Sequence, residues 1–285
     1  MFRLLNVSGR AALEVDGHWY DLARLSGDDI LADPMVAVGR SDELHTLSGR
    51  CAAATPDGEV ADTVLDAPVP RPRQVFAVGL NYADHAAESG VATPPAPLTF
   101  TKFPSAIAGP TADVPLSGEL VDWEVEVVVV IGRTCSQVPV DEAWEVVAGL
   151  TLGQDISDRQ VQMTGTPPQF SLGKSFPAYA PIGPAVVSVD SLADPTDLGL
   201  WCEVSGERMQ DSRTSNLIFS IPTLIGYLSS ICTLAPGDLI FTGTPEGVGM
   251  ARGRFLAEGD VIVSGAEGIG ELRNTCVAGR GALVP

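Results

Sequence analysis

The sequence predicts a β-rich α+β protein, with a small β-containing N-terminal domain over residues 1–68 and a larger mixed domain over residues 69–285. Three observations support this fold class. Short runs of β-branched and other apolar residues alternate with glycine and proline turns, which is typical of strands. Helix signals are few by comparison. Asp66–Arg73 contains three prolines in eight residues, a composition that favours an extended linker and marks the domain boundary.

The predicted elements follow in chain order. Residues 1–66 form a short, polar and turn-rich segment, with a small strand predicted at Ala12–Val15. Asp141–Leu150 begins with acids and carries apolar residues at helical spacing, and Ile221–Ile231 follows the start signal Ser220-Ile-Pro222, so both are predicted helices. Beyond the linker, strands are expected at Val75–Val78, Val125–Ile131, Ala185–Val189, Leu239–Thr242 and Asp260–Val263.

Charge limits the classes of partner. The 285 residues carry 36 acidic and 17 basic side chains, a formal net charge of −19. A strong negative field repels phosphate chains and anionic lipids, so neither nucleic acid nor a membrane surface is an expected partner. With 45% hydrophobic residues, the chain is not a disordered acidic tail. A small anionic ligand would need a local source of positive charge.

The cysteines and the start of the chain predict a cytoplasmic protein. The five cysteines are scattered and form no C-x-x-C pair, which fits neither a disulfide framework nor a zinc cluster and predicts reduced, mostly buried thiols. Met1–Asp16 lacks the features of a signal peptide. The longest charge-free stretch, Thr214–Gly237, is too polar for lipid.

The segment Val121–Ile131 carries the most chemical information. Side chains alternate across a strand, so Asp122, Glu124 and Glu126 are expected on one face. The segment ends in five consecutive apolar residues, as in a strand buried on both faces. Buried carboxylates must be paired or bound to a cation. Glutamates at this spacing, about 6.6 Å apart at Cα, can reach one ion; the alternative is a solvated strand face.

A third oxygen ligand follows the apolar stretch Val146–Leu152. Asp155 stands at the end of this element, with Arg159 and Gln162 four and seven residues later, on one face if a helical turn begins there. Three carboxylates without cysteine or histidine select a hard ion, Mg²⁺ or Mn²⁺, and leave positions for water or substrate. A helix cap or a salt bridge is the alternative role for Asp155.

Five strings in a fixed order carry a family resemblance. They are VGLNYADHAAE (78–88), DWEVE (122–126), QDISDR (154–159), LGKSF (172–176) and PGDLIFTGTPEGVG (236–249), within about residues 74–276. Together they resemble the fumarylacetoacetate hydrolase family. The resemblance implies a mixed β-roll catalytic domain, a homodimer, and one Mg²⁺ or Mn²⁺ held by Glu124, Glu126 and Asp155. The N-terminal segment is similar to the extra domain of some bacterial members.

The resemblance also implies a small 2-oxo acid substrate and roles for further residues. His85 and Glu88 lie three residues apart, which puts them on one face of a short helix, where the carboxylate can orient the imidazole. In the family a matching pair activates water. Lys174 would donate to substrate oxygens and stabilise enolate charge, and Thr244 would offer a hydroxyl or amide to a carboxylate.

The first hypothesis is Mg²⁺-dependent hydrolysis of a C–C bond in a 3-acylpyruvate or fumarylacetoacetate-like 2-oxo acid, through an enolate, with Arg159 and Gln162 holding the substrate oxygens. The alternative reactions use the same metal site, but no water attacks the substrate in them. They are those of an isomerase or decarboxylase of 2-hydroxymuconate-type diacids, such as 2-hydroxyhepta-2,4-diene-1,7-dioate, and of an oxaloacetate decarboxylase or tautomerase. All pass through the same enolate, so the motifs do not separate them. A non-catalytic Ca²⁺-binding module is disfavoured because it needs no His–Glu, lysine or arginine elements.

Overall fold

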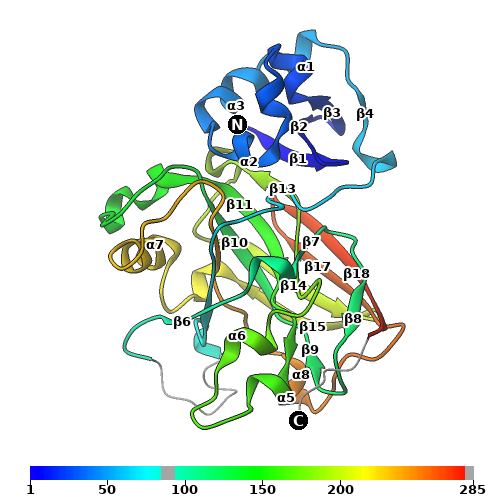
Figure 1. Cartoon of the computed structure of the whole chain (residues 1–285), viewed down its shortest axis with the longest axis vertical. Coiled ribbons are helices and arrows are strands. Elements are labelled where there is room, and N and C mark those ends of the chain that lie inside the picture. The colour runs from blue at the N-terminus through cyan, green and yellow to red at the C-terminus, as the bar shows by residue number, and fades with distance from the viewer. Residues whose placement is uncertain (85–93, 280–285) are drawn as a thin grey trace.

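The computed structural model describes residues 1–84 and 94–279 and confirms the β-rich α+β class (Figure 1). Its strands form one large sheet, one five-stranded sheet and one two-stranded sheet. The large sheet comprises β1 (Arg3–Val7), β2 (Arg10–Val15), β3 (His18–Asp21), β4 (Gly58–Glu59), β5 (Val75–Gly79), β6 (Leu98–Thr101), β7 (Ile107–Ala108), β10 (Val125–Ile131), β11 (Val147–Gln154), β13 (Ala180–Val187) and β16 (Leu239–Phe241). The five-stranded sheet comprises β8 (Val114–Leu116), β14 (Gly199–Val204), β15 (Glu207–Arg213), β17 (Val261–Ala266) and β18 (Gly270–Ala278), and the small sheet β9 (Val121–Asp122) and β12 (Ser157–Asp158).

The α-helices are short and lie at the ends and edges of the sheets. Figure 1 shows α1–α3 at the N-terminal end of the molecule and α5, α6 and α8 at the opposite end. Their bounds are α1 (Leu22–Ser26), α2 (Pro34–Val38), α3 (Ser41–Ser48), α5 (Arg159–Gln162), α6 (Phe170–Gly173), α7 (Ile221–Ser229) and α8 (Gly249–Arg252).

The centre of the large sheet is the strand series β13–β11–β10–β16. Every residue of β10 is buried, because its valine-rich sequence packs on both faces of the sheet. The N-terminal strands extend this sheet, since β1 pairs antiparallel with β13 through Arg3–Val187 and Leu4–Val186. The domain boundary near residue 68 stays a prediction.

The predicted strands are present, with ends shifted by a few residues; Ala185–Val189, for example, belongs to β13, which ends at Val187. The predicted helix at Ile221 is confirmed as α7, with Ser220 accepting a hydrogen bond from the Thr223 amide. Three of the five cysteines are buried and two are partly buried. Across the described ranges, no helix combines the length and the apolar character needed to cross a bilayer.

The predicted helix at Asp141–Leu150 is helical only in its first part and is wrong from Val147 onward. A 3₁₀-helix covers Val140–Val146, and β11 begins at Val147. The apolar spacing of this segment fits both periodicities, and tertiary pairing decides between them, because β11 bonds β10 along one edge and β13 along the other. Gly149 also disfavours a helix interior.

Candidate metal centre

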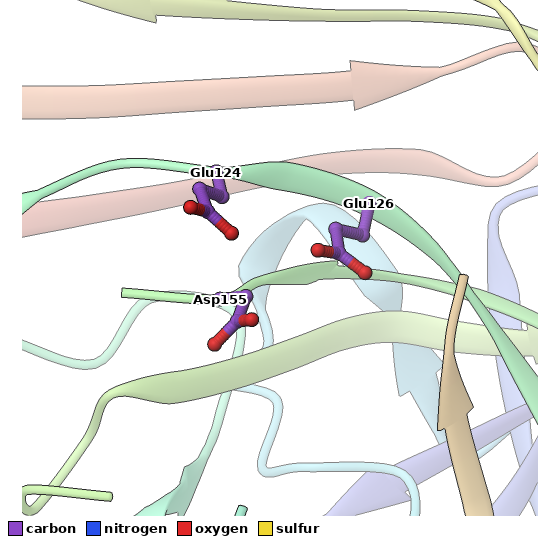
Figure 2. A group of neighbouring side chains, drawn as sticks. All are labelled: Glu124, Glu126 and Asp155. Atoms are coloured by element: carbon purple, nitrogen blue, oxygen red, sulfur yellow. The ribbon is translucent and has the colours of Figure 1, made fainter. Parts of the chain in front are cut away.

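The strand pair β10–β11 brings three carboxylates together. Glu124 precedes β10, Glu126 lies within it, and Asp155 follows the last residue of β11. Because the pair is antiparallel, with Val125 opposite Gln154, the Asp155 amide donates to the Glu124 carbonyl over 2.8 Å. Figure 2 shows the three carboxyl groups facing a common space. One oxygen from each lies within 4.8 Å of the others, and all three residues are buried.

The environment of Glu126 favours a cation. Burial, followed by the charges of Asp155 and Glu124, raises the pKa of Glu126 well above its ordinary value, although the Gly243 amide donates to its Oε2 over 2.7 Å. A bound divalent ion would remove this repulsion. Oxygen donors alone, gathered at this spacing, fit a hard ion such as Mg²⁺ or Mn²⁺.

Two buried lysines contact the cluster. The Lys174 ammonium donates to Glu124 Oε2 and Asp155 Oδ2, both over 2.8 Å. The Lys102 ammonium donates to Asp155 Oδ1 over 2.5 Å and to the Lys174 carbonyl. Burial lowers the pKa of Lys102 despite the attraction of Asp155. Burial opposes the charge of Lys174 as well, but Asp155 and Glu124 outweigh it and raise the pKa of Lys174.

Arg159 and Gln162 lie on the predicted helical turn, which is α5. Asp158 caps this turn by accepting a hydrogen bond from the Val161 amide over 3.0 Å. The Arg159 guanidinium donates to Asp122 Oδ2 over 2.8 Å, to Glu124 Oε1 over 2.7 Å and to Gln162 Oε1 over 2.8 Å. Burial opposes its charge, but Glu124 and Asp122 raise the pKa of Arg159 above its ordinary value.

Asp122 lies outside the carboxylate cluster, although it shares the alternating acidic run. Its Oδ1 accepts the Gly249 amide over 2.6 Å, and its Oδ2 accepts the Met250 amide over 2.9 Å. Asp122 therefore fixes α8 and orients Arg159. Thr244 is also buried, and its hydroxyl accepts a hydrogen bond from Gln210 Nε2 over 2.8 Å.

The cluster opens on a cavity of about 270 Å³. The cavity is lined by predicted site residues and by apolar side chains: Glu124, Arg159, Gln162, Lys174 and Thr244, with Val78, Gly79, Leu80, Phe100, Met163, Phe170, Val248 and Met250. His85 and Glu88 lie outside the described residues. All other predicted site residues are thus brought to one region: five line the cavity, and Glu126 and Asp155 belong to the carboxylate cluster of Glu124.

Sequence reasoning missed three residues that hold this region together. Lys102 gives a weak signal, as one of two lysines in the chain. Gln210 gives no signal in the sequence. Its Oε1 nevertheless accepts a hydrogen bond from the Val125 amide over 3.0 Å, and its Nε2 donates to the Thr244 hydroxyl. Asn81 stands in a quoted string and bonds the Thr242 carbonyl over 2.7 Å.

A β-rich fold that buries three carboxylates beside a cavity lined by lysine and arginine is the arrangement of a candidate metal-dependent enzyme. The family model for the fumarylacetoacetate (FAA) hydrolase C-terminal domain matches residues 74–277, and the chain belongs to this family.

Relatives with different named activities match the chain. The mitochondrial oxaloacetate tautomerase FAHD2B of Bos taurus is 45% identical over 215 residues, covering 74% of this chain and 68% of that protein. A Mycobacterium smegmatis structure provisionally named HpcE has a TM-score of 0.90 at 47% identity, covering 97% of this chain and 99% of that one. Maleylpyruvate hydrolase from Sphingobium sp. SYK-6, solved with manganese(II) and pyruvate, has a TM-score of 0.82 at 29% identity, covering 97% and 99%.

Proposed function

We propose that this protein is a Mg²⁺- or Mn²⁺-dependent hydrolase that cleaves a C–C bond in a 3-acylpyruvate-like 2-oxo acid. The observation that carries the proposal is the buried triad of Glu124, Glu126 and Asp155, whose member Glu124 lines a cavity together with Arg159 and Lys174. The manganese and pyruvate recorded for the Sphingobium hydrolase support the same pairing of ion and 2-oxo acid.

The charges of the centre explain how an acidic protein would hold an acidic substrate. Among the described residues, four buried carboxylates (Asp122, Glu124, Glu126 and Asp155) meet three buried cations (Lys102, Arg159 and Lys174), so the fully ionised group has one excess negative charge. When bound by the triad, a divalent ion supplies Lewis-acid polarisation and reverses that sign.

The residues would then divide the work. Gln162 and Arg159 hold the acid oxygens at the cavity wall. Lys174 directs two N–H donors to carboxylates, and the third is available to a substrate oxygen that gains charge. In this proposal His85, oriented by Glu88, takes a proton from water. The water oxygen bonds to the distal carbonyl carbon, the C–C bond breaks, and its electron pair stays with the pyruvate fragment.

The test is an assay of acylpyruvates with Mg²⁺ or Mn²⁺ that follows loss of the diketo absorbance. We expect turnover that EDTA abolishes, and we expect Glu124→Gln and His85→Ala to lower kcat by at least about 100-fold. His18→Ala, in the N-terminal strand β3, is the matched control. Normal turnover by His85→Ala would contradict the assigned base.

A second candidate is oxaloacetate tautomerase, favoured by the 45% identity to FAHD2B of Bos taurus. The same ion and Lys174 would serve it, but no water would attack. NMR of the products separates the two reactions. Deuterium exchange at C3 without cleavage would favour the tautomerase.

A further inference from the structure

The cavity has two chemically different ends. One end holds Glu124, Arg159 and Lys174 beside the carboxylate triad. Apart from the uncharged polar residues Gln162 and Thr244, the rest of its wall is apolar and includes Leu80, Phe100, Met163, Phe170, Val248 and Met250. Among the described residues that line the cavity, the only cationic side chains are Arg159 and Lys174, and both stand at the acidic end.

In the proposed function both cations serve the 2-oxo acid group, and their ion pairs with the acidic residues keep them at that end, away from a second carboxylate on a substrate tail. The Arg159 guanidinium is held by Asp122 at 2.8 Å and by Glu124 at 2.7 Å. The Lys174 ammonium is held by Glu124 and Asp155, each at 2.8 Å. A carboxylate placed against the apolar wall would therefore meet carbon, with no cationic partner among the described lining residues, which is unfavourable.

The apolar wall is built from constrained parts. The Phe100 and Phe170 rings pack edge to face with centroids 5.7 Å apart. Leu80 has a φ of +55°, in the left-handed region that a leucine rarely adopts. Asn81 holds this bend by donating to the Thr242 and Phe219 carbonyls and accepting the Phe219 amide. A strained residue fixed in this way at a cavity wall points to a role in the site.

We propose that the cavity selects 2-oxo acids with a short, uncharged and apolar tail over those whose tail ends in a carboxylate. The proposal rests on the proposed function and adds to it the class of tail. The volume of about 270 Å³ corresponds to about nine water molecules, enough for the 2-oxo acid group and a short tail.

Binding of stable analogues tests this selection independently of turnover. N-isobutyloxamate and N-oxalylglycine share the chelating oxalyl group, and their tails have similar shape but differ in charge. With saturating Mn²⁺, calorimetry should show N-isobutyloxamate binding at least about tenfold more tightly. Equal or tighter binding of N-oxalylglycine would overturn the inference. A preference for N-isobutyloxamate without acylpyruvate turnover would support the inference and refute the hydrolase.

A charge placed on the apolar wall should invert the preference. Met163 lines the cavity and is half-exposed, so Met163→Arg adds a cation there with little risk to folding. We expect the ratio of the two dissociation constants to shift toward N-oxalylglycine by at least about tenfold. Leu172→Arg adds the same charge to α6 at an exposed side chain outside the cavity lining and should leave the ratio unchanged. Equal shifts in both variants would overturn the assignment of the wall.

Discussion

At the scale of single residues, the centre depends on which charges are compensated and which are not. Asp155 receives hydrogen bonds from both Lys102 and Lys174, whereas Glu126 receives one from the Gly243 amide and feels the charges of Asp155 and Glu124. The charge of Asp155 is therefore compensated by two ammonium groups, whereas the carboxylate of Glu126 is repelled by its two acidic neighbours. Because a bound ion would remove this repulsion, the metal-free and metal-bound proteins should differ in how their stability depends on pH.

The repulsion at Glu126 predicts a pH dependence of stability. Because its folded-state pKa lies above the ordinary 4.5, folding favours the protonated form. The unfolding free energy of the metal-free protein should therefore fall as pH rises above that value through the raised pKa. Urea unfolding in EDTA between about pH 5 and pH 8 measures this decline. Saturating Mn²⁺ should remove it, because the ion favours the charged form.

Glu126→Gln should flatten the decline, since the amide does not titrate. Glu145→Gln, at an exposed position, should keep it. An unchanged slope in Glu126→Gln would show that other groups cause the pH dependence.

Lys102 is predicted to be essential for folding stability. Lys102→Met leaves Asp155 buried with one cation fewer, and breaking a buried ion pair in this way costs about 3–5 kcal/mol of unfolding free energy. Urea unfolding in EDTA measures the loss. Arg71→Met is the control, because its pair with Asp33 is exposed and should contribute at most about 1 kcal/mol. A loss as small as in the control would contradict the prediction.

At the scale of elements, the strands with a clear pattern could be predicted and the long-range contacts could not. The run Val125–Ile131 predicts β10, which contains Glu126, and the carboxylates of Glu126 and of the preceding Glu124 belong to the same cluster. The turn at Arg159 was also predictable from spacing. Lys102 was not, because β6 brings it to Asp155 across 53 residues and no local periodicity encodes that contact. The helix predicted at Asp141–Leu150 ends at Val146, because strand pairing on both sides of β11 outweighs local preference from Val147 onward.

The close packing of β11 against β13 gives a prediction at this scale. A Cβ on Gly149 would lie 2.3 Å from the Val187 carbonyl oxygen, so the two strands would have to separate. Gly149→Ala should lower the unfolding free energy by about 1–3 kcal/mol. Gly49→Ala is the control, because its nearest contact would be an ordinary 3.5 Å. Equal stability of both variants in urea would contradict this account.

At the scale of the whole molecule, the net charge of −19 and the anionic ligand make opposite demands. Most acids are on the surface, where they oppose the approach of another anion. The proposed ion is the local exception. Oxalate should therefore bind with Mn²⁺ present and bind at least about 100-fold more weakly in EDTA, as measured by calorimetry. Equal affinity in both conditions would contradict the assignment of the triad.

Assembly and domain organisation are also properties of the whole molecule. The homodimer stays a prediction, and light scattering of the purified protein would measure it. The boundary near residue 68 also stays a prediction. The pairing of β1 with β13 implies that removing residues 1–68 would expose a strand edge, which favours aggregation.

The chain contains only two lysines, and their side chains are 0% and 2% exposed. Lysine-specific proteases should therefore not cleave the folded protein. Amine-directed reagents should modify only the α-amino group of Met1. Acylation of Lys102 or Lys174 would occur only when the centre opens, with the Met1 amine as an internal standard of reagent strength. A mass-spectrometric time course would measure how often that happens, and divalent ions should slow it. Labelling of Lys102 as fast as Met1 would show that the centre is not closed in solution.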